Sequence, residues 1–151
     1  MQGVARHFRF NRRLVDSLYT DAMVLADEAR AYFDDYGRHE RDELDPMSRV
    51  AFSCESIKVT TRLMHVIAWL LTQRAVAAGE LSVEAARDPS RRLGPAPESS
   101  VATVADLPWS ARGLVRASIA LHKRVALLDA DEPAEPASPA RALQDRLAVA
   151  F

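Results

Sequence analysis

Residues 45–78, DPMSRVAFSCESIKVTTRLMHVIAWLLTQRAVAA, constrain the fold more than any other stretch, because their pattern indicates one long helix. Asp45 is placed to cap this helix, and Pro46 takes its first position, where a missing N–H costs nothing. Gly79 follows as the usual residue for a left-handed C-terminal cap. At 1.5 Å per residue, such a helix would be roughly 50 Å long.

Apolar and small residues form two rows along this helix. The first row advances by four and three residues: Val50, Cys54, Ile57, Thr61, Met64, Ala68, Leu71, Ala75 and Ala78. The second row lies on a neighbouring face: Val59, Leu63, Val66 and Leu70. A helix with so wide an apolar arc must be covered from several sides. We therefore expect the chain to dimerise through this helix. The candidate dimer or partner surface consists of Val59, Leu63, Val66, Leu70 and Arg62.

Two further amphipathic segments predict helices on either side, over about residues 11–36 and 108–129. Gly37 is expected to end the first of them, and the short charged link 38–45 permits an antiparallel hairpin. In this link, Arg38, Glu40 and Arg41 form a candidate charged loop. Prolines and a glycine predict a mobile loop over about residues 88–106. The predicted fold is all-α: an antiparallel three-helix bundle over residues 11–129.

The two ends of the chain differ in composition from the bundle. Residues 1–10 alternate cations with aromatics, which predicts a loose basic arm that either contacts nucleic acid or a membrane surface or folds back on the bundle. Residues 130–151 begin acidic and proline-rich, which predicts a flexible tail. The tail ends in a short amphipathic segment that either folds back or docks on a partner. Its candidate docking residues are Leu143, Leu147, Val149 and Phe151.

Composition bounds the class of protein. The 151 residues are 48% hydrophobic and 27% charged, which is typical of a soluble globular protein. The net charge of −1 argues against a dedicated nucleic-acid-binding domain. The single Cys54 fits a reducing cytosol and excludes an internal disulfide. The longest uncharged run of the central helix, 63–73, is far shorter than the 20 or so residues that cross a bilayer. We expect a cytoplasmic protein without membrane insertion.

No motif for catalysis or cofactor binding is present. The sequence lacks a phosphate-binding glycine loop, a GxSxG turn and an HExxH helix, and its four histidines have no metal-ligand spacing. Cys54, Glu55 and His65 could be taken for a nucleophile, an orienting group and a base. Helical geometry, however, separates Cys54 from His65 by about 16 Å along the axis, so the two side chains cannot meet within one chain. We interpret Cys54 as a small core residue and expect no enzyme, cofactor or metal.

The segments LYTDAMVLADEARAYFDDYGRHERDELDP and RVAFSCESIKVTTRLMHVIAWLLTQRAV resemble the alphaproteobacterial helical family DUF1465. The resemblance covers Leu18 to Val76 and continues more loosely to the C-terminal end. It implies a homodimer of three-helix bundles that acts as a non-enzymatic adaptor for the ClpXP protease in cell-cycle control. The implied partners are CpdR-like and PopA-like regulators and CtrA-like transcription factors as cargo. It also implies a cytoplasmic protein recruited to a cell pole.

A nucleic-acid-binding regulator is the alternative. It would use the basic arm together with four cations of the third helix, Arg112, Arg116, Lys123 and Arg124.

Overall fold

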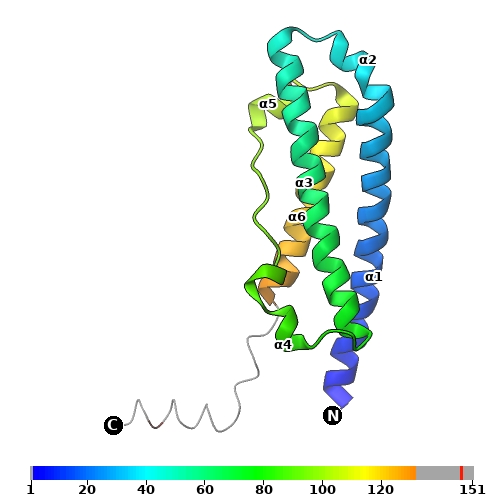
Figure 1. Cartoon of the computed structure of the whole chain (residues 1–151), viewed down its shortest axis with the longest axis vertical. Helices are drawn as coiled ribbons and strands as arrows, with labels where there is room; N and C mark the ends of the chain where they lie inside the picture. The colour runs from blue at the N-terminus through cyan, green and yellow to red at the C-terminus, as the bar shows by residue number, and fades with distance from the viewer. Residues whose placement is uncertain (1, 132–146, 148–151) are drawn as a thin grey trace.

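The fold is all-α, as predicted, in a computed structural model that describes residues 2–131 and 147 (Figure 1). Within these residues there is no strand, and no helix has the length and apolarity that a bilayer requires. The elements are α1 (Gln2–Ala31), a π-helical turn η1 (Tyr32–Tyr36), α2 (Gly37–Asp42), α3 (Pro46–Ala77), α4 (Val83–Ala86), a 3-10 turn η2 (Pro89–Arg91), α5 (Val101–Ala105) and α6 (Trp109–Asp131).

Helix α3 begins and ends where its capping residues lie. The Asp45 carboxylate accepts hydrogen bonds from the Ser48 backbone N–H at 3.2 Å and from the Ser48 hydroxyl at 2.6 Å. Pro46 is the first helical residue, and Gly79 has a φ of +75°. This left-handed conformation turns the chain out of the helix at little cost for a glycine. The helix therefore lies within one residue of the expected range.

The three long helices lie side by side, with α3 packed against both α1 and α6 (Figure 1). Helix α1 is antiparallel to the other two. Helices α3 and α6 are parallel, since Arg62 contacts Ser118 and, further along both helices, Trp69 contacts Asp129. The expected antiparallel arrangement is wrong for this pair. Because two parallel helices start at the same end, the chain between them must return along the length of the molecule.

Residues 78–108 make this return, and we call them the crossover. Residues 88–106, predicted to be a mobile loop, contain η2 and α5, and the latter is capped by the Ser100 hydroxyl. Between these elements the chain is extended, and nine extended residues span about 30 Å. Arg92 fixes the start of this stretch, because it donates to the Asp129 carboxylate at 2.8 Å and to the Asp129 carbonyl at 2.6 Å.

Helix α1 departs from prediction at both ends. Residues 1–10 were expected to form a loose arm, but α1 begins at Gln2, and no proline interrupts the residues that follow. Gly37 does not stop the helical path either, because it has α-helical dihedrals and continues into α2. The link 38–45 is therefore helical as far as Asp42. Gly37 is buried, and a Cβ atom there would lie 2.7 Å from the Tyr32 carbonyl oxygen.

The core lies where α3 meets α1 and α6. Three aromatic rings from η1 and α3 pack together at centroid distances of 5.1–6.2 Å, two of the pairs edge-on and the third tilted: Tyr32, Phe33 and Phe52. The second row of α3 is buried throughout, whereas most of the first row is exposed. The chain thus buries one of the two apolar rows of its central helix and leaves the other outside.

Two glycines give a matched stability test. We expect Gly37→Ala to lower the free energy of unfolding by about 1–3 kcal/mol, because the new methyl group would meet backbone. Gly113→Ala, in open space on α6, should raise it by about 0.5–1 kcal/mol through helix propensity. Urea unfolding followed by circular dichroism measures both. Equal effects of the two substitutions would contradict the close packing at Gly37.

Candidate functional site

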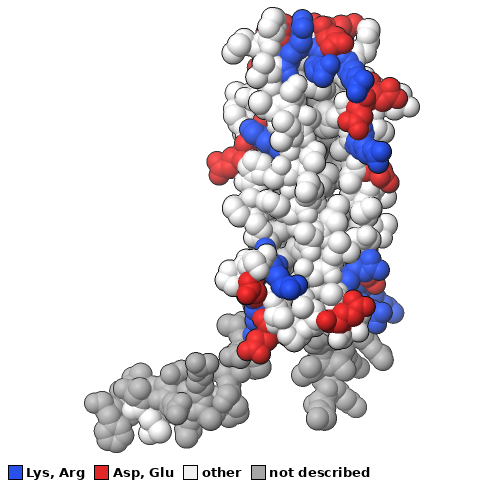
Figure 2. Space-filling view, viewed as in Figure 1, with Lys and Arg blue, Asp and Glu red and all other residues white. Residues whose placement is uncertain are grey.

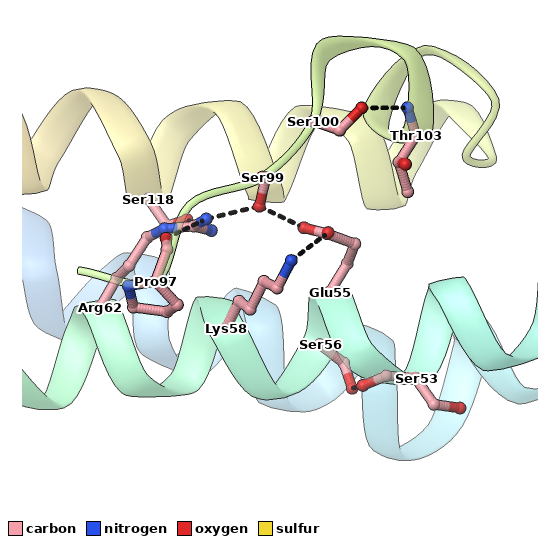
Figure 3. A network of polar contacts seen from close by, with 10 residues as sticks. All are labelled: Ser53, Glu55, Ser56, Lys58, Arg62, Pro97, Ser99, Ser100, Thr103 and Ser118. Carbon is pink, nitrogen blue, oxygen red and sulfur yellow. Dashed lines mark hydrogen bonds and ion pairs between the residues drawn. The ribbon is translucent and has the colours of Figure 1, made fainter.

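A buried polar network at the middle of α3 is the most elaborate side-chain arrangement described (Figure 3). The Arg62 guanidinium, 1% exposed, donates to the Pro97 carbonyl at 2.9 Å, to the Ser99 hydroxyl at 2.5 Å and to the Ser118 hydroxyl at 3.3 Å. Ser99 in turn donates to Glu55 at 2.5 Å. One side chain of α3 thereby holds both the crossover and α6.

The network contains charged side chains that are almost completely shielded from solvent. Burial lowers the pKa of Arg62, and the negative charge of Glu55 opposes this shift. Glu55 is 2% exposed and is also paired with the Lys58 ammonium at 3.1 Å. Buried ions are tolerated when they are paired and hydrogen-bonded in this way. Arg62 and Glu55 direct their hydrogen bonds to groups of the same chain, so we interpret the network as a structural clamp.

The structure does not assemble Cys54, Glu55 and His65 into a catalytic group. Cys54 is exposed on the outer side of α3, which corrects its interpretation as a core residue, whereas Glu55 belongs to the buried network. The His65 ring lies beside Gly94 of the crossover, and its buried Nδ1 has no hydrogen-bond partner. Among the described residues, no three His, Cys, Asp or Glu side chains are grouped as metal ligands.

The candidate dimer or partner surface predicted from the sequence is not accessible to a partner, because it lies inside the single chain. All five of its residues are at most 4% exposed within the single chain: Val59, Leu63, Val66, Leu70 and Arg62. The reason is that α1 and α6 both pack on this face, so that the chain covers it without a partner.

The exposed apolar surface of α3 is the first row. Its large members are 47–65% exposed: Val50, Ile57, Met64 and Leu71. Figure 2 shows that charged side chains gather toward the two ends of the molecule and leave a largely uncharged middle. Scattered exposed apolar residues are normal, but a continuous row of them marks a contact surface.

A second surface feature is a groove between α1 and α6 with a volume of about 430 Å³. Leu25, Glu28 and Tyr32 line one wall, and residues of α6 from Trp109 to Ala117 line the other. The indole of Trp109 is 80% exposed at its rim, and Gly113 leaves open space beside it. The sequence analysis did not find this groove, since α1 and α6 are far apart in the chain.

The candidate charged loop lies in α2. Glu40 accepts a hydrogen bond from the Tyr32 hydroxyl, Arg41 pairs with the adjacent Asp42 at 3.3 Å, and Arg38 is exposed. Burial, then Glu40, raises the pKa of Tyr32. Of the tail docking residues, only Leu147 is described, and it is 52% exposed. The other three lie outside the described residues: Leu143, Val149 and Phe151.

Comparison with known proteins places this helical chain in a known family. The model of DUF1465, described as a protein of unknown function, matches residues 7–151, and the chain therefore belongs to that family. Among solved structures, the chain is similar to the crystal structure of RcdA from Caulobacter crescentus CB15. The two share 37% sequence identity with a TM-score of 0.64, over 77% of this chain and 88% of that chain. No curated protein matches.

We expect Arg62→Met to lower the free energy of unfolding by about 3–5 kcal/mol, because it removes one partner from a buried charged network. The matched control is Arg74→Met, which removes a half-exposed ion pair to Asp16 and should cost less than about 1 kcal/mol. Chemical denaturation of both variants provides the comparison. A loss of less than about 1 kcal/mol in Arg62→Met would show that the clamp contributes little.

Proposed function

We propose that this protein is a non-enzymatic adaptor that delivers cell-cycle regulators, such as CtrA-like transcription factors, to the ClpXP protease. The similarity to RcdA, at 37% identity over most of both chains, is the observation that carries the proposal. Membership in DUF1465 supports it, because the adaptor role is what the resemblance to that family implies. The proposed setting is the cytoplasm, with recruitment to a cell pole.

The structure supports an adaptor role because its candidate functional features are exposed surfaces that could bind other proteins. The buried polar network fixes the fold, and the exposed residues include an apolar row on α3 and a groove between α1 and α6. Binding surfaces gain most of their affinity from a few large apolar or aromatic anchors in such places. No catalytic step is part of the proposal.

We assign cargo binding to the groove between α1 and α6. Arg112 and Arg116 line it, and among the described residues no carboxylate lies within ion-pair distance of either. Glu28 is the one acidic residue of the groove walls. The excess positive charge around an apolar floor suits a cargo segment that carries an apolar anchor flanked by carboxylates. Trp109 would contact that anchor.

The tail, residues 132–151, would contact the protease or its CpdR-like and PopA-like regulators. Leu143, Leu147, Val149 and Phe151 are the proposed docking residues. A second copy of the chain completes the proposed set of partners. The net charge of −1 disfavours the nucleic-acid-binding alternative, and neither comparison supports it.

Removal of residues 132–151 should abolish cargo delivery while leaving the helical fold intact, because α6 ends at Asp131. The measurement is the rate of cargo degradation by purified ClpXP with its regulators, together with the circular dichroism of the truncated chain. Delivery by the truncated protein at the full-length rate would refute the role of the tail.

Trp109→Ala should slow cargo delivery at least about 10-fold, because it removes an exposed aromatic anchor without disturbing the core. Leu127→Ala on the same helix is the matched control, since Leu127 is 67% exposed but does not line the groove. Cargo affinity by fluorescence anisotropy separates binding from turnover. Unchanged affinity in Trp109→Ala would place the cargo on another surface.

A further inference from the structure

The wall that α6 contributes to the groove between α1 and α6 carries a row of residues at a spacing of four. Trp109, Gly113 and Ala117 all line the groove, and their spacing places them on one side of the helix. Gly113 and Ala117 are exposed, and a Cβ atom at Gly113 would have no neighbour within 4 Å. Because the distance between packed helices depends on the side chains at the contact, this wall permits a further helix to approach closely.

Residues 140–151, ARALQDRLAVAF, contain a matching row. Leu143, Leu147 and Phe151 have the same spacing of four, which gives a helix of these residues one apolar face. Leu147 is the one residue of this segment that the structure describes. It has a helical backbone conformation and is 52% exposed. The segment therefore offers an apolar face of the kind that the groove can cover.

Two rows of equal spacing fit together when their helices are antiparallel. Large residues of the segment then lie opposite small residues of α6, and two aromatic residues meet at one end. The facing pairs are Leu143 with Ala117, Leu147 with Gly113, and Phe151 with Trp109. This pairing fills the open space beside Gly113, and close packing stabilises such a contact. The segment would thereby become the fourth helix of the bundle.

The length of the intervening chain agrees with this position. Helix α6 ends at Asp131, and Ala117 lies about 21 Å back along the helix axis. Residues 132–139 are rich in proline and can span about 25 Å in an extended conformation. They are therefore long enough to bring residues 140–151 to the groove. A segment tethered in this way meets its site at an effective concentration on the order of 1 mM.

The charges along the same path are complementary. Residues 132–139 include Glu132 and Glu135, and on the way to the groove they would pass the exposed Lys123 and Arg124 of α6. Among the described residues, neither of these two cations has a carboxylate within ion-pair distance. Opposite charges on the connecting residues and on α6 would thus steer the segment toward the groove.

We propose that residues 140–151 occupy the groove between α1 and α6 of their own chain, as an antiparallel fourth helix. The matching rows, the length of residues 132–139 and their acidic charge all favour this occupant. The docking itself does not depend on the adaptor function. One consequence does rest on the proposed function: cargo assigned to the same groove would displace the segment, so the tail would be presented to the protease only by a chain that holds cargo.

Quenching of tryptophan fluorescence by acrylamide tests the docking without cargo or protease. Trp69 is 4% exposed, so the quenching reports chiefly on Trp109, which is 80% exposed. We expect the full chain to be quenched at least about 2-fold less than a chain that ends at Asp131, because the docked segment would cover the indole. Equal quenching of the two proteins overturns the proposal.

Two substitutions in the full chain test the docking face. Leu147→Glu should raise the quenching to the level of the truncated chain, because a carboxylate would be buried beside Gly113. Val149→Glu is the matched control and should leave the quenching unchanged, since residue 149 lies on the opposite side of a helix from Leu147. Circular dichroism checks that both variants keep the bundle. Equal quenching of the two variants overturns the proposed face.

Dilution separates docking within one chain from docking on another. The protection of Trp109 should be constant between about 0.1 and 100 μM protein, because a tethered segment binds independently of concentration. Protection that is lost on dilution would place the segment on a second copy and overturn the proposal. The competition with cargo has its own measurement: Leu147→Glu should bind cargo at least about 3-fold more tightly than the wild type. An unchanged cargo affinity would refute the shared groove while the quenching still decides the docking.

Discussion

The arrangement of the molecule depends on one buried guanidinium. Arg62 binds the crossover through Pro97 and Ser99 and binds α6 through Ser118, while Glu55 supplies the compensating charge through Ser99. The crossover packs Leu93, Val104 and Leu107 on the core, and the polar contacts of Arg62 fix its extended middle between them. With the crossover held, α6 starts at the same end as α3 and runs parallel to it.

This arrangement divides α3 into two faces with different roles. The second row, Trp69 and the network residues belong to the chain's own core. The first row faces outward along the same helix. The candidate functional surfaces are those that the clamp leaves free: the outer row of α3 and the groove between α1 and α6.

Local chemistry made the long helices predictable. The ends of α3 are determined by short-range hydrogen bonds and allowed dihedrals at Asp45, Pro46 and Gly79. Both ends could therefore be predicted from the local sequence. The choice between the two apolar rows was not predictable in this way, because both rows have the right period and hydrophobicity. Charged residues are seldom buried, so no local pattern predicts a buried position for Arg62. Its partners, Pro97, Ser99 and Ser118, lie 35–56 positions away in the sequence. The groove depends on the packing of α1 against α6, which no local pattern encodes.

The central claim is that the buried Arg62 guanidinium holds the crossover against α3 and α6. A double-mutant cycle of Arg62→Met and Ser99→Ala, followed by chemical denaturation, measures this most directly, because it isolates the coupling of Arg62 to the crossover. The account predicts a coupling free energy of at least about 1 kcal/mol between the two side chains. Purely additive effects of the two substitutions would contradict the account.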